Sequence, residues 1–136
     1  RNMGTRFMAT REAPIHDNIK QRLVEASERD TALIFRTMRN TARVFKNQVA
    51  EEVRTIEGRG NATIDDIKHL VAGERGRKAM QEGDTDGGIW SAGMVAGLIH
   101  DIPSCQELVD RIMTEAEAII DGRLAGMRAT AVEVIS

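Results

Sequence analysis

The residues of this chain that could do chemistry begin near its first position, with Met3-Gly4-Thr5. A glycine lets the backbone approach an anion closely, consecutive backbone N–H groups can point at the anion's oxygens, and a threonine hydroxyl adds one more donor. These residue types in this order predict a phosphate-binding turn at the end of a strand. The tripeptide alone also fits an ordinary strand-to-loop turn, so the surrounding sequence has to decide.

The other reactive side chains form no catalytic or metal-binding pattern. His16, His69 and His100 are scattered along the chain and lack the HxxxH spacing of metal ligands. We expect them to be solvated or to cap helices. Cys105 stands at the N-terminus of a predicted helix and has no identifiable partner, so we expect an ordinary buried cysteine. No metal site is expected.

Composition limits the class of protein. The chain has 136 residues, which is one domain at most and shorter than the roughly 200 residues of a complete (β/α)₈ barrel. Its 19 Lys and Arg against 21 Asp and Glu leave no basic excess, which argues against a nucleic-acid partner. Only 3% of the residues are aromatic, which suits packed helices better than a β-sandwich.

The length of the apolar segments and the number of cysteines predict whether the protein meets a membrane and in which compartment it works. The longest apolar stretch, at about residues 89–99, is too short to cross a bilayer, so no membrane partner is expected. A single cysteine excludes a disulfide framework and makes a reducing compartment the default. We therefore expect a cytoplasmic protein.

Hydrophobic periodicity and capping residues predict a mostly α fold with a short strand at the N-terminus. Residues 2–3 are expected to end a strand that runs into a loop, because Gly4 and Thr5 disfavour a helix. The elements expected after it are a helix at 18–28 capped by Asp17, a short strand at 31–35, a helix from 40 or 41 to 57, a helix from 64 after the Thr63/Asp66 capping box, a helical turn at 77–81 and a loop at 82–88.

The last third of the chain is expected to be helical. Residues 89–99 are interpreted as a buried helix whose glycines permit close backbone approach. Ser104 and Glu107 form a capping box for the clearest helix, at about 105–120. Residues 121–136 lose the apolar period and are expected to be a loose tail.

The opening string as a whole is far more specific than its tripeptide. Residues 2–10, NMGTRFMAT, followed by Glu12 and by residues 14–16, PIH, resemble the nitronate monooxygenase (2-nitropropane dioxygenase-like) family of flavoproteins. Further matches follow in the family's order over about residues 2–125: Lys20, Asp30-Thr31, Arg43, Asn47, the glycine-rich stretch 83–88 and Ser91-Ala92-Gly93.

The resemblance implies a parent fold, an FMN-binding α/β barrel of the TIM type with a helical domain inserted after its eighth strand. This chain is then expected to be a C-terminal part, and the N-terminal barrel portion is its missing partner. Residues 1–12 are the end of the last barrel strand with the FMN-phosphate loop, and residues 13–88 are the inserted helical domain. Residues 89–125 are the returning C-terminal barrel helices, and residues 126–136 are the tail.

The resemblance also implies the site. Asn2, Met3, Gly4 and Thr5 match the segment that contacts the FMN phosphate, the last two most directly through backbone N–H and hydroxyl donors. None of the three histidines falls at the position of the family's catalytic base, so no catalytic residue is expected in this chain. Met94 stands where the family often has glutamine, which leaves no polar role there.

The activity implied is that of an FMN-dependent oxidoreductase that oxidises alkyl nitronates with oxygen, the cofactor doing the redox chemistry. An NADH:quinone oxidoreductase or an enoyl-acyl-carrier-protein reductase of the same family is the alternative, and a homodimeric parent is compatible with each. A different class stays open, a non-catalytic helical interaction module. Exposed apolar faces on the helices at 41–57 and 105–120 would support it. Alone, the chain is expected to bind no FMN.

Overall fold

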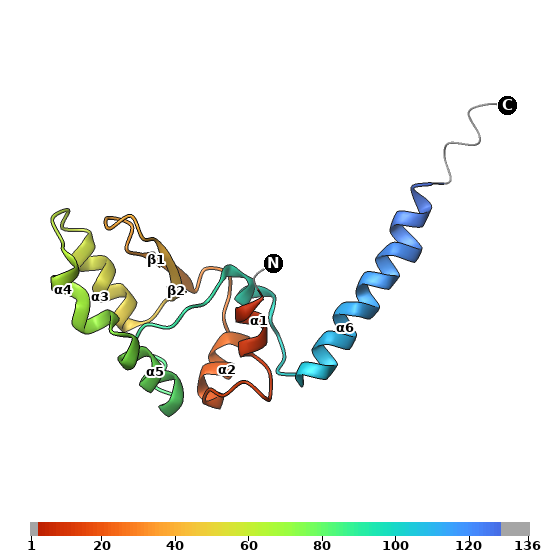
Figure 1. Cartoon of the computed structure of the whole chain (residues 1–136), viewed down its shortest axis with the longest axis horizontal. Coiled ribbons are helices and arrows are strands. Elements are labelled where there is room, and N and C mark those ends of the chain that lie inside the picture. The colour runs from red at the N-terminus through yellow and green to blue at the C-terminus, as the bar shows by residue number, and fades with distance from the viewer. Residues whose placement is uncertain (1–2, 129–136) are drawn as a thin grey trace. The chain divides into compact units, whose positions relative to one another are not determined.

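The fold was described from a computed structural model, which describes residues 3–128. The chain divides into two compact units, Arg1–Ile102 and Pro103–Ser136, and each is considered by itself (Figure 1). The first unit holds short helices and one small sheet, and the second holds a single helical rod. The described part of the chain is therefore mostly helical, as the sequence predicts, with a sheet of two strands.

The first unit contains eight elements among its described residues. Its strands pair antiparallel, with Thr31 opposite Phe45 and Ile34 opposite Ala42. In chain order the elements are α1 (Gly4–Met8), α2 (Asp17–Val24), β1 (Thr31–Ile34), β2 (Ala42–Phe45), α3 (Gln48–Glu57), α4 (Ile64–Val71), α5 (Gly73–Glu82) and the 3₁₀ helix η1 (Met94–Leu98).

Two hydrophobic clusters hold this unit together. One lies between the sheet and helices α3 and α4, with Ile34, Val44 and Val53 among its buried members. The other joins α2 to the segment after α5. Its largest side chains, Phe45 and Trp90, stack with ring centroids 4.3 Å apart and planes 7° from parallel. Strand β2 thus contributes to both clusters and links them.

The prediction of one helix over 41–57 is wrong in its first part. Residues 42–45 form β2, and the helix begins only after Asn47, whose side chain caps α3 by accepting the N–H of Ala50. The apolar spacing of Ala42, Phe45 and Val49 fits a helix, but pairing with β1 and stacking on Trp90 decide the conformation. Tertiary contacts have overridden a local pattern.

The expected strand-to-loop start is also corrected where it can be examined. Asn2 lies outside the described residues, Met3 is in no strand, and residues 4–8 form helix α1. The helix forms despite Gly4 and Thr5 because its side chains have distant partners. Arg6 donates to the carboxylate of Asp101 at 3.0 Å and to its backbone oxygen at 3.2 Å.

The observed capping residues show which of the predicted helix boundaries are correct. The Thr63/Asp66 capping box starts α4 as predicted, and the strand predicted at 31–35 is β1. Helix α2 is capped by His16, not by Asp17, and it ends at Val24 rather than at residue 28. His16 accepts the N–H of Asn18 through Nδ1, which confirms the capping role expected for a histidine. Helix α5 is longer than the predicted turn at 77–81.

Residues 89–99 are not the buried helix that was expected. Ser91 forms a bridge to Val44 at the edge of the sheet, and only η1 is helical. The glycines nevertheless allow other segments to approach the backbone closely, as predicted. A Cβ at Gly97 would come within 2.6 Å of the backbone N of Glu28, and one at Gly76 would meet the backbone of Ile89. The small residues therefore allow separate segments to come into contact, and they do not form an interface between two helices.

The second unit is a rod formed by α6 (Cys105–Ala118) and a π-helical continuation, η2 (Ile119–Leu124). The Ser104/Glu107 capping box is confirmed, with the Glu107 N–H 3.1 Å from the Ser104 hydroxyl oxygen. The loose tail expected from residue 121 is corrected as far as Leu124, while residues 129–136 lie outside the described part. Among the described residues no helix is long and apolar enough to cross a bilayer.

The side chain of Asn47 joins three segments of the first unit. Besides capping α3, its amide nitrogen donates to the backbone oxygens of Thr85 at 2.9 Å and Gly88 at 2.8 Å, and the residue is only 6% exposed. Trp90 also donates to Thr85 O through its indole N–H, at 3.2 Å. The amide thus fixes the 84–88 loop against α3 and leads the chain to Trp90.

Replacing Asn47 by aspartate tests this arrangement. Asn47→Asp keeps the oxygen that caps α3 but removes both donated hydrogen bonds and sets a buried carboxylate against two carbonyl oxygens. We expect a loss of about 2–4 kcal/mol in the free energy of unfolding, measured by urea unfolding followed through the fluorescence of Trp90. Asn61→Asp, the same change at an exposed position, is the control. Equal losses in the two variants would contradict this role.

Candidate functional site

Residues 4–5 and residues 91–95 meet at one concave surface of the first unit. We call it the Thr5 pocket. It has a volume of about 620 Å³. Its lining combines the predicted phosphate turn, part of β2 and the segment that leads into η1: Gly4, Thr5, Met8, Ala42, Arg43, Ser91, Ala92, Gly93, Met94 and Val95.

A hydrogen bond joins the two sides of the Thr5 pocket. The backbone N–H of Gly93 donates to the hydroxyl oxygen of Thr5 at 2.9 Å, across 88 positions of sequence. A threonine hydroxyl has one proton to donate and two lone pairs to accept. The Gly93 bond uses one lone pair, so the hydroxyl can still donate a hydrogen bond of its own.

The other wall of the Thr5 pocket is held by the sheet. The N–H of Phe45 donates to Trp90 O at 2.9 Å, and Ser91 bridges to Val44, so residues 90–91 run along β2 as a partial third strand. Because the Asn47 amide and the Phe45–Trp90 stack fix the start of this segment, Ser91 and the residues after it arrive at Thr5 in a defined position.

The chemical character of the Thr5 pocket suits an anionic group with an apolar portion. Among the described residues that line it, Arg43 is the one that carries a charge, and Thr5 and Ser91 bring hydroxyls. The guanidinium of Arg43 is oriented by a hydrogen bond to the Thr31 hydroxyl, at 3.0 Å. Met8, Met94 and Val95 supply apolar surface. A cation and hydroxyl donors beside apolar side chains fit a phosphorylated aromatic cofactor.

The residues predicted for the site are only partly assembled in the structure. Gly4 and Thr5 line the Thr5 pocket, whereas Met3 is outside the lining and 41% exposed. Asn2 lies outside the described residues. No group of three or more His, Cys, Asp and Glu side chains placed to hold a metal ion occurs among residues 3–128.

The structure adds residues that the sequence reasoning did not assign to the site. Arg43 and the Ser91-Ala92-Gly93 stretch were recognised as matches to the family, but no site role was drawn from them. The signal that could have assigned them to the site is their match to the family's sequence pattern. Only the fold shows that β2 and the segment after Trp90 form the wall opposite Thr5.

Comparison with known proteins gives the family. A family model described as nitronate monooxygenase matches residues 1–115. Two curated proteins, from Mycobacterium tuberculosis and Rhodococcus jostii, carry the same name, (3aS,4S,5R,7aS)-5-hydroxy-7a-methyl-1-oxo-octahydro-1H-indene-4-carboxyl-CoA dehydrogenase. The first is 24% identical over 149 aligned residues, covering 84% of this chain and 42% of the relative. The second is 26% identical over 170, covering 93% and 46%.

Solved structures agree in fold. FabK from Thermotoga maritima is 30% identical, with a TM-score of 0.78 over 92% of this chain and 39% of that chain. A point mutant of the same protein gives 29% identity and a TM-score of 0.73, over 92% and 36%. The chain therefore spans less than half the length of the relatives it matches. On the family match over residues 1–115, this chain belongs to the nitronate monooxygenase family.

Proposed function

We propose that this chain forms one edge of the FMN site of an oxidoreductase and that the rest of an α/β barrel, contributed from outside this chain, completes that site. The observation that carries the proposal is the Thr5 pocket. It brings the phosphate turn predicted from the sequence to the Ser91-Ala92-Gly93 segment of the same family pattern. The division into a phosphate loop at 1–12, an inserted domain at 13–88 and returning helices at 89–125 belongs to this proposal.

In this proposal the chain's residues bind and orient the phosphate end of the cofactor. When bound, FMN supplies the redox chemistry. The Thr5 hydroxyl, held by the N–H of Gly93, would donate a hydrogen bond to a phosphate oxygen, and Gly4 would let the backbone approach it. Arg43 supplies the compensating charge from β2. The side chains of Met94 and Val95 supply apolar surface at the edge of the pocket.

Surface left uncovered by this chain supports a missing portion. Leu98 of η1 is 79% exposed and Met94 is 56% exposed. Along α6 and η2 only Leu108 is buried and Ile112 is half-buried, while five large apolar side chains are exposed: Val109, Met113, Ile119, Ile120 and Leu124. Apolar surface of this extent is unusual for a finished monomer and suits a contact surface. Exposed apolar faces on both helices would have favoured the non-catalytic interaction module, but the apolar face of α3 is buried and only that of α6 is exposed.

The substrate is proposed with two alternatives. Oxidation of alkyl nitronates with oxygen follows from the family's name. The alternative, an NADH-dependent reductase that uses a quinone or an enoyl thioester, gains support from the relatives. The two curated proteins are named as dehydrogenases of a carboxyl-CoA compound, and the solved ones are FabK. We therefore place the thioester alternative beside nitronate oxidation. A cytoplasmic location and a homodimeric parent remain part of the proposal.

The isolated 136-residue chain should not bind FMN, because the Thr5 pocket would hold only the phosphate end of the cofactor and the rest of the site would come from outside this chain. Titration followed by flavin fluorescence and absorbance is expected to show no saturation in the micromolar range. Sequencing the gene upstream of the codon for Arg1 supplies the matched observation, an open frame that encodes several βα units. Saturable micromolar binding by the chain alone, or an in-frame start codon close upstream, would contradict the proposal.

In the complete protein, Thr5 is the residue whose loss should weaken FMN most specifically. Thr5→Val keeps the shape but removes the hydroxyl, and one hydrogen bond to a charged group is worth about 1.5–3 kcal/mol, so FMN affinity should fall roughly 10- to 100-fold. Thr5→Ser should retain most of the affinity. Thr55→Val, at an exposed position of α3, is the control. Unchanged FMN affinity in Thr5→Val would place the phosphate elsewhere.

Turnover of the complete protein separates the alternatives. Oxygen consumption with propionate 3-nitronate is compared with NADH oxidation in the presence of benzoquinone or of an enoyl-CoA. We expect one of these reactions to exceed the others by at least tenfold in kcat/KM, because one substrate pocket stabilises one transition state. Absence of all three activities in a protein that carries FMN would overturn this choice of reactions.

A further inference from the structure

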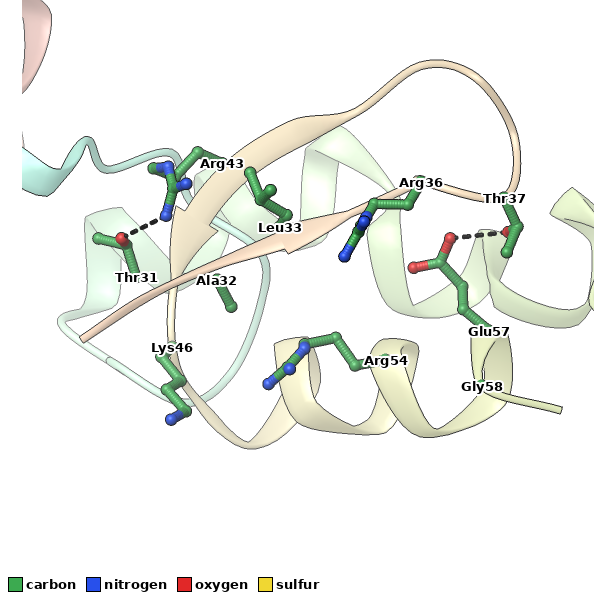
Figure 2. A pocket seen from close by; sticks show the side chains of 10 residues that line it. All are labelled: Thr31, Ala32, Leu33, Arg36, Thr37, Arg43, Lys46, Arg54, Glu57 and Gly58. Carbon is green, nitrogen blue, oxygen red and sulfur yellow. Dashed lines mark hydrogen bonds between the residues drawn. The ribbon is translucent and has the colours of Figure 1, made fainter. Parts of the chain in front are cut away.

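A second concave surface, rich in arginine, lies beside the sheet in the first unit. We call it the arginine pocket, and its volume is about 560 Å³. Figure 2 shows its position between β1, the loop that follows β1, and helix α3. It is lined by Thr31, Ala32, Leu33, Arg36, Thr37, Arg43, Lys46, Arg54, Glu57 and Gly58.

The charge of the arginine pocket is opposite to that of the chain. Four of its lining side chains are cationic and one is a carboxylate, whereas the whole chain carries a net charge of −2. The cations come from three segments. Arg36 is in the loop, Arg43 and Lys46 belong to β2 and the residue after it, and Arg54 is on α3. In Figure 2 the side chains of Arg36 and Arg54 enter from opposite sides, one from the loop and one from the helix.

The one carboxylate of the arginine pocket is already engaged. Glu57 is 7% exposed and accepts the backbone N–H of Phe35 and the hydroxyl of Thr37, each at 3.0 Å. In Figure 2 it turns toward Thr37, at the end of the pocket away from Lys46. Two hydrogen bonds to the loop thus occupy the carboxylate, and it forms no salt bridge with the cations among the described residues.

The cations differ in how far they are neutralised. Arg36 and Lys46 form no salt bridge or side-chain hydrogen bond among residues 3–128, and both are exposed. Arg43 donates to a neutral hydroxyl, that of Thr31. Arg54 pairs with Glu51 at 2.8 Å, but both partners are nearly half exposed, and a surface pair of this kind exchanges readily with solvent or a better ligand. An incoming anion would therefore compete with two partly exposed carboxylates, that of Glu51 at Arg54 and that of Asp30, whose charge interacts with Lys46.

The backbone that carries Arg36 is held in an unfavourable conformation. Phe35 and Arg39, on either side of the tip of the loop, have φ values of +60° and +55°, in the left-handed region that non-glycine residues avoid. Such conformations cost of order 1–3 kcal/mol each and collect at sites where a side chain must be held in place. The Glu57 carboxylate, bound to the Phe35 N–H, holds the loop so that Arg36 faces α3.

We propose that the arginine pocket binds the phosphate groups of a ligand that carries several of them, such as coenzyme A or a nicotinamide dinucleotide. Guanidinium forks bind phosphate oxygens in pairs, and an ammonium adds a point charge. Guanidinium groups and an ammonium that line one concave surface from three segments match several phosphate oxygens better than they match a single carboxylate.

Arg43 relates the arginine pocket to the Thr5 pocket, because it lines both. A ligand whose phosphates lie in the arginine pocket would have its other end directed along β2 toward the Thr5 pocket. This orientation, unlike phosphate binding itself, rests on the proposed function. It predicts a substrate or electron donor with a phosphorylated handle far from its reacting atom.

The test is a titration of the 136-residue chain with inorganic pyrophosphate, coenzyme A and NADPH, with adenosine as an uncharged probe. Binding is measured by calorimetry and located by amide chemical shifts. We expect saturable binding of the phosphorylated probes, with the largest shifts in residues 31–58, and none with adenosine. Tighter binding of coenzyme A than of pyrophosphate and NADPH identifies a thioester substrate as the source. Tighter binding of NADPH identifies the electron donor.

Arginine variants distinguish a direct contact with the phosphates from a general effect of net charge on binding. Arg36→Gln and Arg54→Gln, both at exposed positions, should each weaken pyrophosphate binding roughly tenfold, as expected for loss of a charge-assisted pair of hydrogen bonds. Arg77→Gln changes the net charge equally from an exposed position on α5 and should change the affinity less than twofold.

Three results would overturn the proposal: no saturation at millimolar pyrophosphate, equal losses in all three variants, or shifts concentrated outside residues 31–58. Because pyrophosphate binding needs no flavin, it can succeed where FMN binding at Thr5 fails, and the reverse. The two claims therefore fail separately.

Discussion

The buried amide of Asn47 is the interaction on which the rest of the first unit depends. Its oxygen starts α3, and its nitrogen holds the backbone of Thr85 and Gly88. The segment that follows that loop in the first unit takes its position from this point, because Trp90 stacks on Phe45 and Ser91 joins the edge of β2. A side chain that satisfies three backbone groups in the interior cannot be exchanged for an apolar one without leaving carbonyls unpaired.

Strand β2 connects the part of the fold that Asn47 holds to both concave surfaces, the Thr5 pocket and the arginine pocket. Its inward residues, Val44 and Phe45, join the two hydrophobic clusters, while Arg43 reaches the Thr5 pocket and the arginine pocket. A two-stranded sheet is marginal by itself. Packing against α3 and the partial third strand at residues 90–91 make it a rigid base. The geometry explains how one short strand can position a proposed cofactor edge and a proposed phosphate site together.

Sequence reasoning succeeded where a structure is determined by neighbouring residues. The capping boxes at Thr63 and Ser104 and the strand at 31–34 were predicted because their signals are local. It failed at 42–45 and 89–99, where a helical apolar period was overridden by pairing between distant segments. The Gly4-Thr5 part of the site was predictable from motif and family. The arginine pocket was not, because its cations come from three segments that only the fold brings together.

The central claim is that Thr5, oriented by Gly93, receives the phosphate of FMN. The most direct measurement is a crystal structure of the complete protein with FMN bound. We expect a phosphate oxygen within hydrogen-bonding distance of Thr5 Oγ1, with the Gly93 N–H still donating to that hydroxyl and Arg43 facing the phosphate. A phosphate bound elsewhere, with solvent in the Thr5 pocket, would contradict it.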